Sequence, residues 1–293
     1  MKKPASDPFV DTVFSPNDFG GTESSVLSLS YFPAGSNGFF RAPVLICGPS
    51  EALLVDGGFT YEDGDALVKA IQATGKALTI VYVSQSDPDY YFSLKPLRDA
   101  FPDAAFIAAS ATVEAIKQSV NKKLAAWGPQ LGENGPQSIS DIVMPDPFDG
   151  PSVAVNGIPV EIVSAEGLPN RRYLWAPSLK AVFGGVMVFS QVHVWTADTR
   201  TKAERAAWIA NLDKIAARDP SVVIPGHMAP DSAIDLSCVQ YTRTYLLAFE
   251  EELERAADAT ALKVAMESRF PNLGMDVALE IGSKVAKGEM AWG

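Results

Sequence analysis

The chain is poor in the residues that most often bind transition metals. Its 293 residues include two histidines, His193 and His227, and two cysteines, Cys47 and Cys238. Zinc favours nitrogen and sulfur ligands over oxygen, and a zinc centre that needs four or five imidazoles cannot be assembled from two histidines. Free cysteines are usually buried, and Cys47 lies in an apolar run, so we expect two plain thiols and no disulfide.

Positive charge is also scarce. The chain has 24 lysines and arginines against 35 acidic residues, which gives a net charge of −11. This balance argues against a nucleic-acid partner, because phosphate binding needs clustered basic residues, and against an anionic membrane surface. No stretch approaches the ~20 apolar residues of a membrane span, and the N-terminus lacks the apolar core of a secretory signal. We therefore expect a cytoplasmic location.

Several common catalytic and phosphate-binding motifs are missing as well. The chain contains no Gly-x-Ser-x-Gly nucleophile elbow, no P-loop and no Gly-x-Gly-x-x-Gly fingerprint. Nothing in the sequence therefore indicates a serine nucleophile of that type or a loop that cradles phosphates.

What the chain does contain is enough apolar sequence for a large core, with 47% hydrophobic and 20% charged residues. Length alone gives a weak expectation of two domains, although large α/β folds often run this long as one. Residues 1–25 resemble an irregular arm anchored by Phe9, Phe14 and Phe19. Apolar periodicity and turn residues predict the following elements. Strands are expected at 26–31, 44–47, 52–55, 78–83, 105–108, 173–175, 181–183 and 221–224, a hairpin at 153–163, and helices at 66–74, 110–127, 202–218 and from 232 onward. The hairpin should turn at Asn156-Gly157, which favours a type I′ turn, and Ser110 is the expected N-cap of its helix.

The order of these elements predicts the architecture. A strand-rich segment followed by alternating strands and helices occurs twice, which is typical of two sheets with helices outside them. We expect an α/β fold, a four-layer αββα sandwich over residues 26–230. Residues 231–293 should form a C-terminal helical extension of the same domain, with an apolar stripe that includes Leu246, Phe249 and Leu253.

Five segments, in order, resemble the metallo-β-lactamase superfamily. They are Leu54-Val55-Asp56-Gly57-Gly58, Val83-Ser84-Gln85-Ser86-Asp87-Pro88-Asp89-Tyr90, Ser164-Ala165-Glu166-Gly167, Phe183-Gly184-Gly185-Val186-Met187-Val188-Phe189 and Ile224-Pro225-Gly226-His227. They match the family's strand-end Asp-Gly, Thr-His-x-His-x-Asp-His, Pro-Gly-His-Thr, Phe-Thr-Gly-Asp-x-x-Phe and strand-end Gly-His segments. The resemblance covers about residues 26–230 and implies the family's αββα fold and a site at the ends of these strands.

The resemblance also assigns the family's metal positions to particular residues. The first metal position, three histidines in the family, falls on Gln85, Asp87 and Glu166, and the second falls on Asp89, Tyr90 and His227. The bridging aspartate falls on Val186, which cannot ligate a metal. Only Asp89 and His227 match, so the resemblance implies that the family's two-zinc site is absent.

The substituted pocket would gather several acids. If the implied fold holds, Asp56, Asp87, Asp89 and Glu166 lie near one another, and two carboxylates ~4 Å apart repel by about 4 kcal/mol at an effective dielectric constant of 20. A proton, a basic side chain such as Arg171 or Arg172, or a single hard cation would have to offset this. Oxygen ligands suit magnesium, manganese or calcium, with Asp87, Asp89, Glu166 and His227 as candidate ligands.

Each of these residues also has a purely structural interpretation. Asp87 and Asp89 flank Pro88, where aspartate is common in turns, and Tyr90 can pack a helix. Glu166 can be a solvated loop residue. Residues 191–195 alternate like a strand, so His193 and Trp195 are either sheet residues or an aromatic pocket wall that suits a small organic ligand.

Two functions of different classes follow. The first is a hydrolase-like enzyme for a small ester, lactone or amide, with either an oxygen-rich mononuclear metal or metal-free acid–base chemistry. Its candidate catalytic residues are Asp87, Asp89, Tyr90 and His227, and Asp56, Gln85, Val186, His193 and Trp195 line the pocket. The second is a non-catalytic protein that binds a small molecule or a protein partner. The C-terminal helices offer a surface for a homo-oligomer.

Overall fold

The first of two main sheets is formed by the N-terminal half of the chain. The computed structural model describes residues 26–292, so the expected arm at 1–25 lies outside the described residues. The sheet has the order β1-β2-β3-β4-β5-β6, antiparallel from β1 to β3 and parallel from β3 to β6. Its strands are β1 (Ser28–Tyr31), β2 (Val44–Cys47), β3 (Glu51–Val55), β4 (Ala77–Val83), β5 (Ala105–Ala108) and β6 (Asp146–Pro147). Between them lie the helices α1 (Tyr61–Thr74), α2 (Pro88–Tyr91), α3 (Leu94–Ala100) and α4 (Ser110–Leu131).

The C-terminal half forms the second sheet and the remaining helices. The sheet has the order β12-β10-β9-β8-β7, and β11 pairs with β13 beside it. The strands are β7 (Ser152–Val155), β8 (Ile158–Ser164), β9 (Arg172–Ala176), β10 (Ala181–Phe183), β11 (Phe189–Ser190), β12 (Val222–Val223) and β13 (His227–Met228). The helices are α5 (Lys202–Ala217), α6 (Leu236–Arg255), α7 (Ala259–Arg269) and α8 (Asp276–Ala286).

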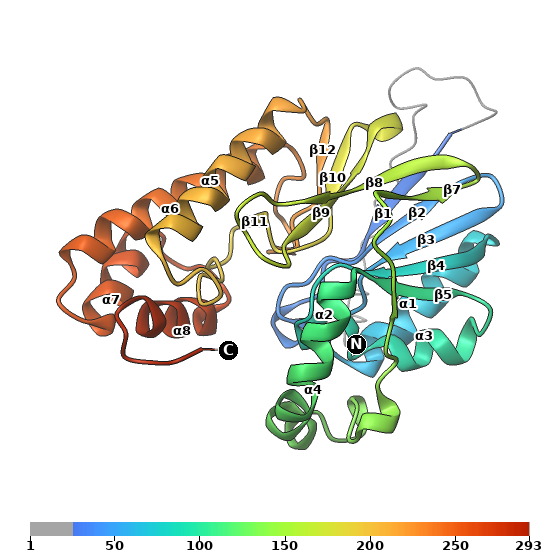
Figure 1. Ribbon diagram of the computed structural model, residues 1–293, viewed down its shortest axis with the longest axis horizontal. Coiled ribbons are helices and arrows are strands. Elements are labelled where there is room, and N and C mark those ends of the chain that lie inside the picture. Colours follow the sequence, from blue (N-terminus) through green and yellow to red (C-terminus); the bar gives the residue numbers. More distant parts are fainter. Residues whose placement is uncertain (1–25, 293) are drawn as a thin grey trace, which may run out of the picture.

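Alternation along the strands builds the layers. On β3, Leu53 and Val55 face the inter-sheet core that contains Leu174 and Phe183, whereas Leu54 belongs to the core beneath the helices. This alternation is what a strand buried on both faces requires. Helices α1 and α3 lie against the first sheet, and α5 and α6 lie beyond the second (Figure 1). The expected four-layer αββα sandwich with additional C-terminal helices is confirmed.

Local sequence signals explain most element boundaries. The hairpin of β7 and β8 turns at Asn156 and Gly157, whose φ values of 50° and 78° fit the expected type I′ turn. Helix α1 begins earlier than expected because Thr60 and Asp63 form a capping box at its start. Ser110, expected as an N-cap, is instead the first residue of α4, and its hydroxyl donates to Asp149.

The strand considered at residues 191–195 is absent, whereas the expectation for the two cysteines is confirmed. Residues 191–195 do not form a strand, since β11 ends at Ser190 and the backbone beyond makes one isolated bridge, from Val192 to Gly274. Cys47 and Cys238 are both free thiols, as expected. Among residues 26–292, no helix has the length and apolarity needed to cross a membrane.

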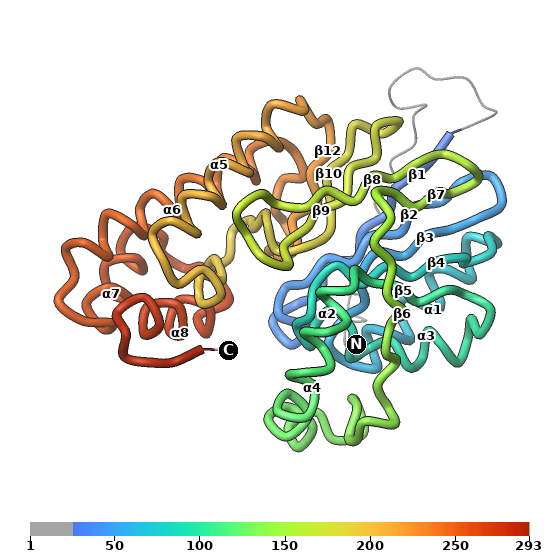
Figure 2. Tube along the Cα trace, viewed as in Figure 1, coloured from blue at the N-terminus to red at the C-terminus, as the bar shows by residue number. Residues whose placement is uncertain are grey.

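The C-terminal helices complete the molecule on the side of the second sheet. Helix α6 packs against α5 and buries Tyr245, Leu246 and Phe249 completely. Helices α7 and α8 pack on each other, and the chain then turns back toward the middle of the molecule (Figure 2). This return brings the last described residues near the ends of the strands, where the site lies.

Candidate functional site

Asp56 anchors the site at the end of β3. Its backbone is left-handed, with a φ of 65°, and its carboxylate is fully buried. Oδ1 accepts a hydrogen bond from the Ser84 backbone nitrogen at 2.7 Å, and Oδ2 accepts from Ser84 Oγ at 2.7 Å and from Arg41 Nη2 at 3.1 Å. Burial raises the pKa of Asp56, and Arg41 and the Ser84 bonds oppose this effect. Asp56 thereby ties the end of β3 to the loop that follows β4.

That loop and the short helix α2 bring Asp89 and Tyr90 to His227. Pro88 occupies the first turn of α2, and His227 begins β13 after Pro225 and Gly226. Nε2 of His227 lies 3.3 Å from the Tyr90 hydroxyl and 3.6 Å from Asp89 Oδ2. The expected convergence of Asp89, Tyr90 and His227 is therefore present.

The protonation state of His227 follows from its partners. Nδ1 lies 2.7 Å from the Phe39 carbonyl oxygen, which can only accept, so Nδ1 carries the proton and Nε2 is an acceptor. Burial and the nearby Arg41 lower the pKa of His227 to about 3, so the ring is neutral near pH 7. Phe39 adopts a left-handed φ of 53°, which is costly for a bulky residue and concentrates backbone strain beside this histidine.

Arg41 is the central cation of the site, and sequence reasoning missed it. It is fully buried just before β2, and its guanidinium donates to the Gly226 carbonyl oxygen and lies 3.6 Å from the centre of the Tyr90 ring. Its Nε lies 3.8 Å from Asp89 Oδ2. Arg41 thus balances Asp56 and Asp89, a role that the sequence suggested for Arg171, Arg172 or a metal. The only signal was an arginine between Phe40 and Ala42 in an otherwise apolar segment.

Asp89 has the electrostatic properties of an acid–base group. Burial raises the pKa of its carboxyl to about 7, with Arg41 lowering it and Asp87 adding to the rise. Its Oδ2 has no hydrogen-bond partner within residues 26–292. Asp87 is less buried, and its Oδ1 lies 3.4 Å from Lys123 Nζ. The two neighbouring acids are therefore balanced by different basic side chains.

The remaining expected site residues divide into two groups. Val186 and Trp195 line the same cavity as Asp87, Asp89 and His227, whereas Gln85 lines a neighbouring pocket. Glu166 does not join them, because its side chain is 81% exposed and pairs with Lys214 of α5. His193 also lies elsewhere: it is buried, with Nδ1 2.9 Å from the Tyr245 hydroxyl. The cation site expected from Asp87, Asp89, Glu166 and His227 is therefore not assembled.

An aromatic cavity opens over Asp89 and His227. Its volume is about 180 Å³, and it lies between α4 and the C-terminal segment. Its walls are mainly aromatic and aliphatic, formed by Phe39, Phe59, Trp127, Val186, Trp195, Met275, Val277, Ile281 and Trp292. The C-terminal residues come from a segment that we expected to be only a helical extension. No local pattern marks them as site residues, because the long return of the chain brings them there.

Comparison with known proteins identifies the family. The model of the metallo-beta-lactamase superfamily matches residues 37–227. The chain belongs to the metallo-β-lactamase superfamily. Its fold is similar to that of a metallo-beta-lactamase family protein from Thermus thermophilus, with 16% identity, a TM-score of 0.61 and coverage of 89% of this chain and 91% of that one.

Two other solved structures show the same fold. A beta-lactamase domain protein from Burkholderia ambifaria matches with 15% identity and a TM-score of 0.61, covering 92% of this chain and 89% of that one. A metallo-beta-lactamase from Pontibacter korlensis matches with 15% identity and a TM-score of 0.54, covering 80% and 99%. The comparison with curated proteins found no match.

The residues present do not fit the metal ions typical of the metallo-β-lactamase superfamily. Where the family places its second metal, this chain has Asp89 and His227 but also the guanidinium of Arg41, whose fixed positive charge opposes a second cation. The first metal position has lost Glu166 to an ion pair on the surface. Within residues 26–292, no three histidine, cysteine, aspartate or glutamate side chains are grouped so that they could hold a metal.

Proposed function

We propose that this protein is a metal-independent, hydrolase-like enzyme that acts on a small ester, lactone or amide bearing an apolar group. The observation that carries the proposal is the Asp89 carboxyl, which lines the aromatic cavity and has a pKa of about 7. Its buried Oδ2 faces Arg41 and His227 and has no hydrogen-bond partner within residues 26–292. A general base works best when its pKa lies near the working pH. The cavity supports an apolar substrate group beside that base.

The reaction that fits this arrangement is the direct attack of water on a carbonyl carbon. Deprotonated Asp89 accepts a proton from the water, the new carbon–oxygen bond forms, and the carbonyl oxygen gains negative charge. Lys123, which lines the same cavity, supplies a positive charge for that oxygen. The carbon–oxygen or carbon–nitrogen bond of the leaving group then breaks, and the proton on Asp89 passes to the leaving atom.

Two other residues hold the base in position. The positively charged guanidinium of Arg41 holds the Asp89 carboxylate in place, with Nε 3.8 Å from Oδ2. His227 is neutral and, through Nε2, accepts from the Tyr90 hydroxyl. The Tyr90 hydroxyl also lies 3.2 Å from the Gly185 carbonyl oxygen, so two acceptors compete for its one hydroxyl proton.

A non-catalytic small-molecule-binding protein is the second candidate. Val186 stands where the family has a bridging aspartate, and Arg41 already partly neutralises Asp89, which weakens it as a base. The aromatic cavity would bind a ligand equally well without turnover. The two functions differ in whether product forms when ligand binds.

Hydrolysis of 4-nitrophenyl and benzyl esters, aryl lactones and anilides tests the proposal. The full chain is assayed with and without EDTA, beside Asp89→Asn and the matched control Glu166→Gln, which alters an exposed acid outside the cavity. We expect activity that EDTA leaves unchanged and that falls by about 100-fold or more in Asp89→Asn, the range for loss of a general base. Full activity in Asp89→Asn, or loss of activity with EDTA, would overturn it. Ligand binding without turnover would favour the second candidate.

A further inference from the structure

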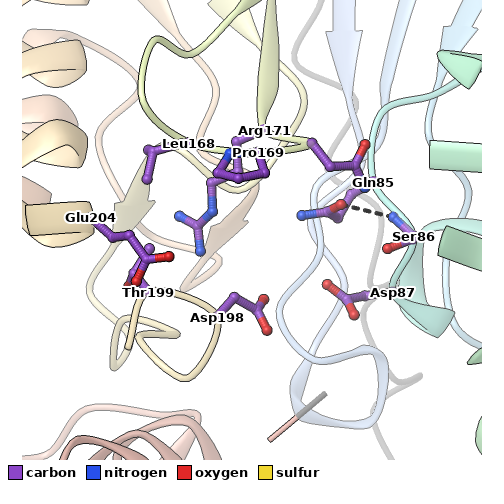
Figure 3. Close-up of a pocket in the computed structure, with 10 residues that line it drawn as sticks. Gln85, Ser86, Asp87, Leu168, Pro169, Arg171, Asp198, Thr199 and Glu204 are labelled. Carbon is purple, nitrogen blue, oxygen red and sulfur yellow. Dashed lines mark hydrogen bonds between the residues drawn. The ribbon is translucent and has the colours of Figure 1, made fainter. Parts of the chain in front are cut away.

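A second, polar pocket adjoins the aromatic cavity. It has a volume of about 130 Å³ and lies between the loop after β4, residues 168–171 and residues 198–204 (Figure 3). Asp87 lines both pockets. Trp195 and Trp292, which line the aromatic cavity, donate from Nε1 to the Asp198 carboxylate of the polar pocket at 3.1 and 2.9 Å. The two pockets therefore share a wall and can receive different parts of one molecule.

Arg171 supplies an unsatisfied donor group to the polar pocket. The residue is only 4% exposed, its guanidinium lies 4.1 Å from the centre of the Trp208 ring, and it points into the pocket (Figure 3). Nη1 and Nη2 have no hydrogen-bond partner among the described residues. A buried donor without an acceptor is costly, and the planar guanidinium matches a carboxylate with two parallel hydrogen bonds.

The opposite side of the pocket has the reverse charge. The carboxylates of Asp87 and Asp198 point toward each other across the pocket, in the close-up of Figure 3. Lys123 lies beside Asp87, but Asp198 has only the two neutral indole donors as hydrogen-bond partners within residues 26–292. Two facing carboxylates favour a positively charged group between them. An ammonium group satisfies both, because it has three donors.

We infer that the two pockets together bind an α-amino acid with an apolar side group. Its carboxylate meets Arg171, its ammonium lies between Asp87 and Asp198, and its apolar group occupies the aromatic cavity. A cavity of roughly 150 Å³ can hold benzene, so the cavity of about 180 Å³ has room for an aromatic ring. The inference rests on the proposed function in taking this cavity as the substrate site. It narrows the substrate to an amino acid with free ammonium and carboxylate groups, whose side chain carries the apolar group through an ester or amide bond.

Calorimetric titration of the full chain with L-phenylalanine tests this inference. The comparison ligands are 3-phenylpropionate, which lacks the ammonium, and 2-phenylethylamine, which lacks the carboxylate. We expect L-phenylalanine to bind at least about 10-fold more tightly than either, because each comparison ligand leaves charged groups of the pocket unpaired. No binding of L-phenylalanine, or equal affinity for either comparison ligand, would overturn the inference. This comparison uses the unaltered protein, so it does not depend on the folding of variants.

Two variants assign the contacts. Arg171→Met should lower the affinity for L-phenylalanine by at least about 10-fold and leave the affinity for 2-phenylethylamine unchanged. Asp198→Asn should lower the affinity for both ligands. The matched controls are Arg172→Met, whose guanidinium bonds Asn170 and Thr112, and Asp149→Asn, whose carboxylate caps Ser110. Unchanged affinity in Arg171→Met would contradict the proposed orientation. L-Phenylalanine has no bond to hydrolyse, so its binding is separable from turnover: binding without ester hydrolysis contradicts only the proposed function, and hydrolysis without binding contradicts only this inference.

Discussion

The guanidinium of Arg41 lies between Asp56 and Asp89, with Nη2 3.1 Å from Asp56 Oδ2 and Nε 3.8 Å from Asp89 Oδ2. Both acids are buried, so each needs positive charge nearby. The residues that correspond to Asp89 and Asp56 in the metallo-β-lactamase superfamily are a metal ligand and a residue that supports the metal site, respectively. A fixed side-chain cation therefore performs here the charge balance that a metal ion performs in the family. It also explains how a chain with two histidines keeps the family's strand-end acids.

Removal of Arg41 should destabilise the protein strongly. Arg41→Met leaves Asp56 buried without its cation, and loss of one partner of a buried ion pair costs about 3–5 kcal/mol. We expect a fall of that size in the free energy of unfolding, measured by urea denaturation at pH 7. Arg41→Lys should lose less, because it keeps the charge but not the contact with Gly226. Equal stability of Arg41→Met and the unaltered protein would show that the ion pair has no structural role.

Opposite pH dependences of stability are expected from Asp89 and His227. Between pH 4 and 6.5, folded Asp89 keeps a proton that unfolded aspartate loses, because its pKa is raised to about 7. Over the same range, unfolded histidine gains a proton that folded His227 does not take, because its pKa is lowered to about 3. The two effects cancel in the unaltered protein, since folded and unfolded states then bind equal numbers of protons at these sites.

Single substitutions should expose each effect. In Asp89→Asn only His227 remains, so stability should rise with pH between 4 and 6.5 by about 1.4 kcal/mol per pH unit relative to the unaltered protein. In His227→Gln only Asp89 remains, so stability should fall with rising pH by about the same amount. Urea denaturation at three pH values gives the slopes. Parallel slopes in both variants and the unaltered protein would mean that neither pKa is shifted.

The sequence predicted the parts of the fold and site that depend on local signals. The Asn156-Gly157 turn indicated a hairpin, and apolar runs marked the buried strands. Asp89 and His227 could be paired because each follows a strand of the α/β core, and strand ends meet at one edge of such a fold. Arg41 could not be predicted as the cation, because its contact with Asp56 depends on the irregular segment before β2. The same holds for Trp292, which reaches the cavity only through the packing of α7 and α8.

Glu166 shows the limit of transferring roles along a resemblance. The segment is in the expected place after β8, but the family's histidine is replaced by an acid whose nearest cation is Lys214 on the neighbouring helix. A carboxylate at a loop surface gains more from water and a lysine than from three other acids. The resemblance predicted the place of this segment in the fold but not the direction of the Glu166 side chain.

Divalent metal ions should have no measurable effect on stability. Arg41 opposes a cation beside Asp89, and Glu166 is too exposed to contribute a ligand. We expect an unchanged melting temperature with EDTA and with added zinc, magnesium, manganese or calcium. By contrast, a site with a Kd 100-fold below the added concentration would contribute about 2.7 kcal/mol. Stabilisation of the unaltered protein by zinc, together with none in Asp89→Asn, would contradict the expectation and place a metal at Asp89.

The C-terminal helices should be required for folding. Helix α6 packs on α5 and contributes Tyr245, Leu246 and Phe249 to the core, all of them fully buried. Burial of each such side chain contributes about 1.5–3 kcal/mol. The free energy of unfolding of a typical domain is about 5–15 kcal/mol, so loss of these three side chains alone removes a large part of it. A chain that ends at Ile234 should therefore be insoluble or lack a cooperative unfolding transition.

Two substitutions on α6 make the same prediction without removing chain. Phe249→Ala should lower the free energy of unfolding by about 3–5 kcal/mol, because it leaves a cavity in the core. Leu247→Ala on the same helix should change it by less than about 0.5 kcal/mol, because Leu247 is 41% exposed. Both are measured by urea denaturation. A chain ending at Ile234 that stays soluble and monomeric with an unchanged melting temperature, or equal losses in the two variants, would show that α6 does not complete the core and that the fold closes without it.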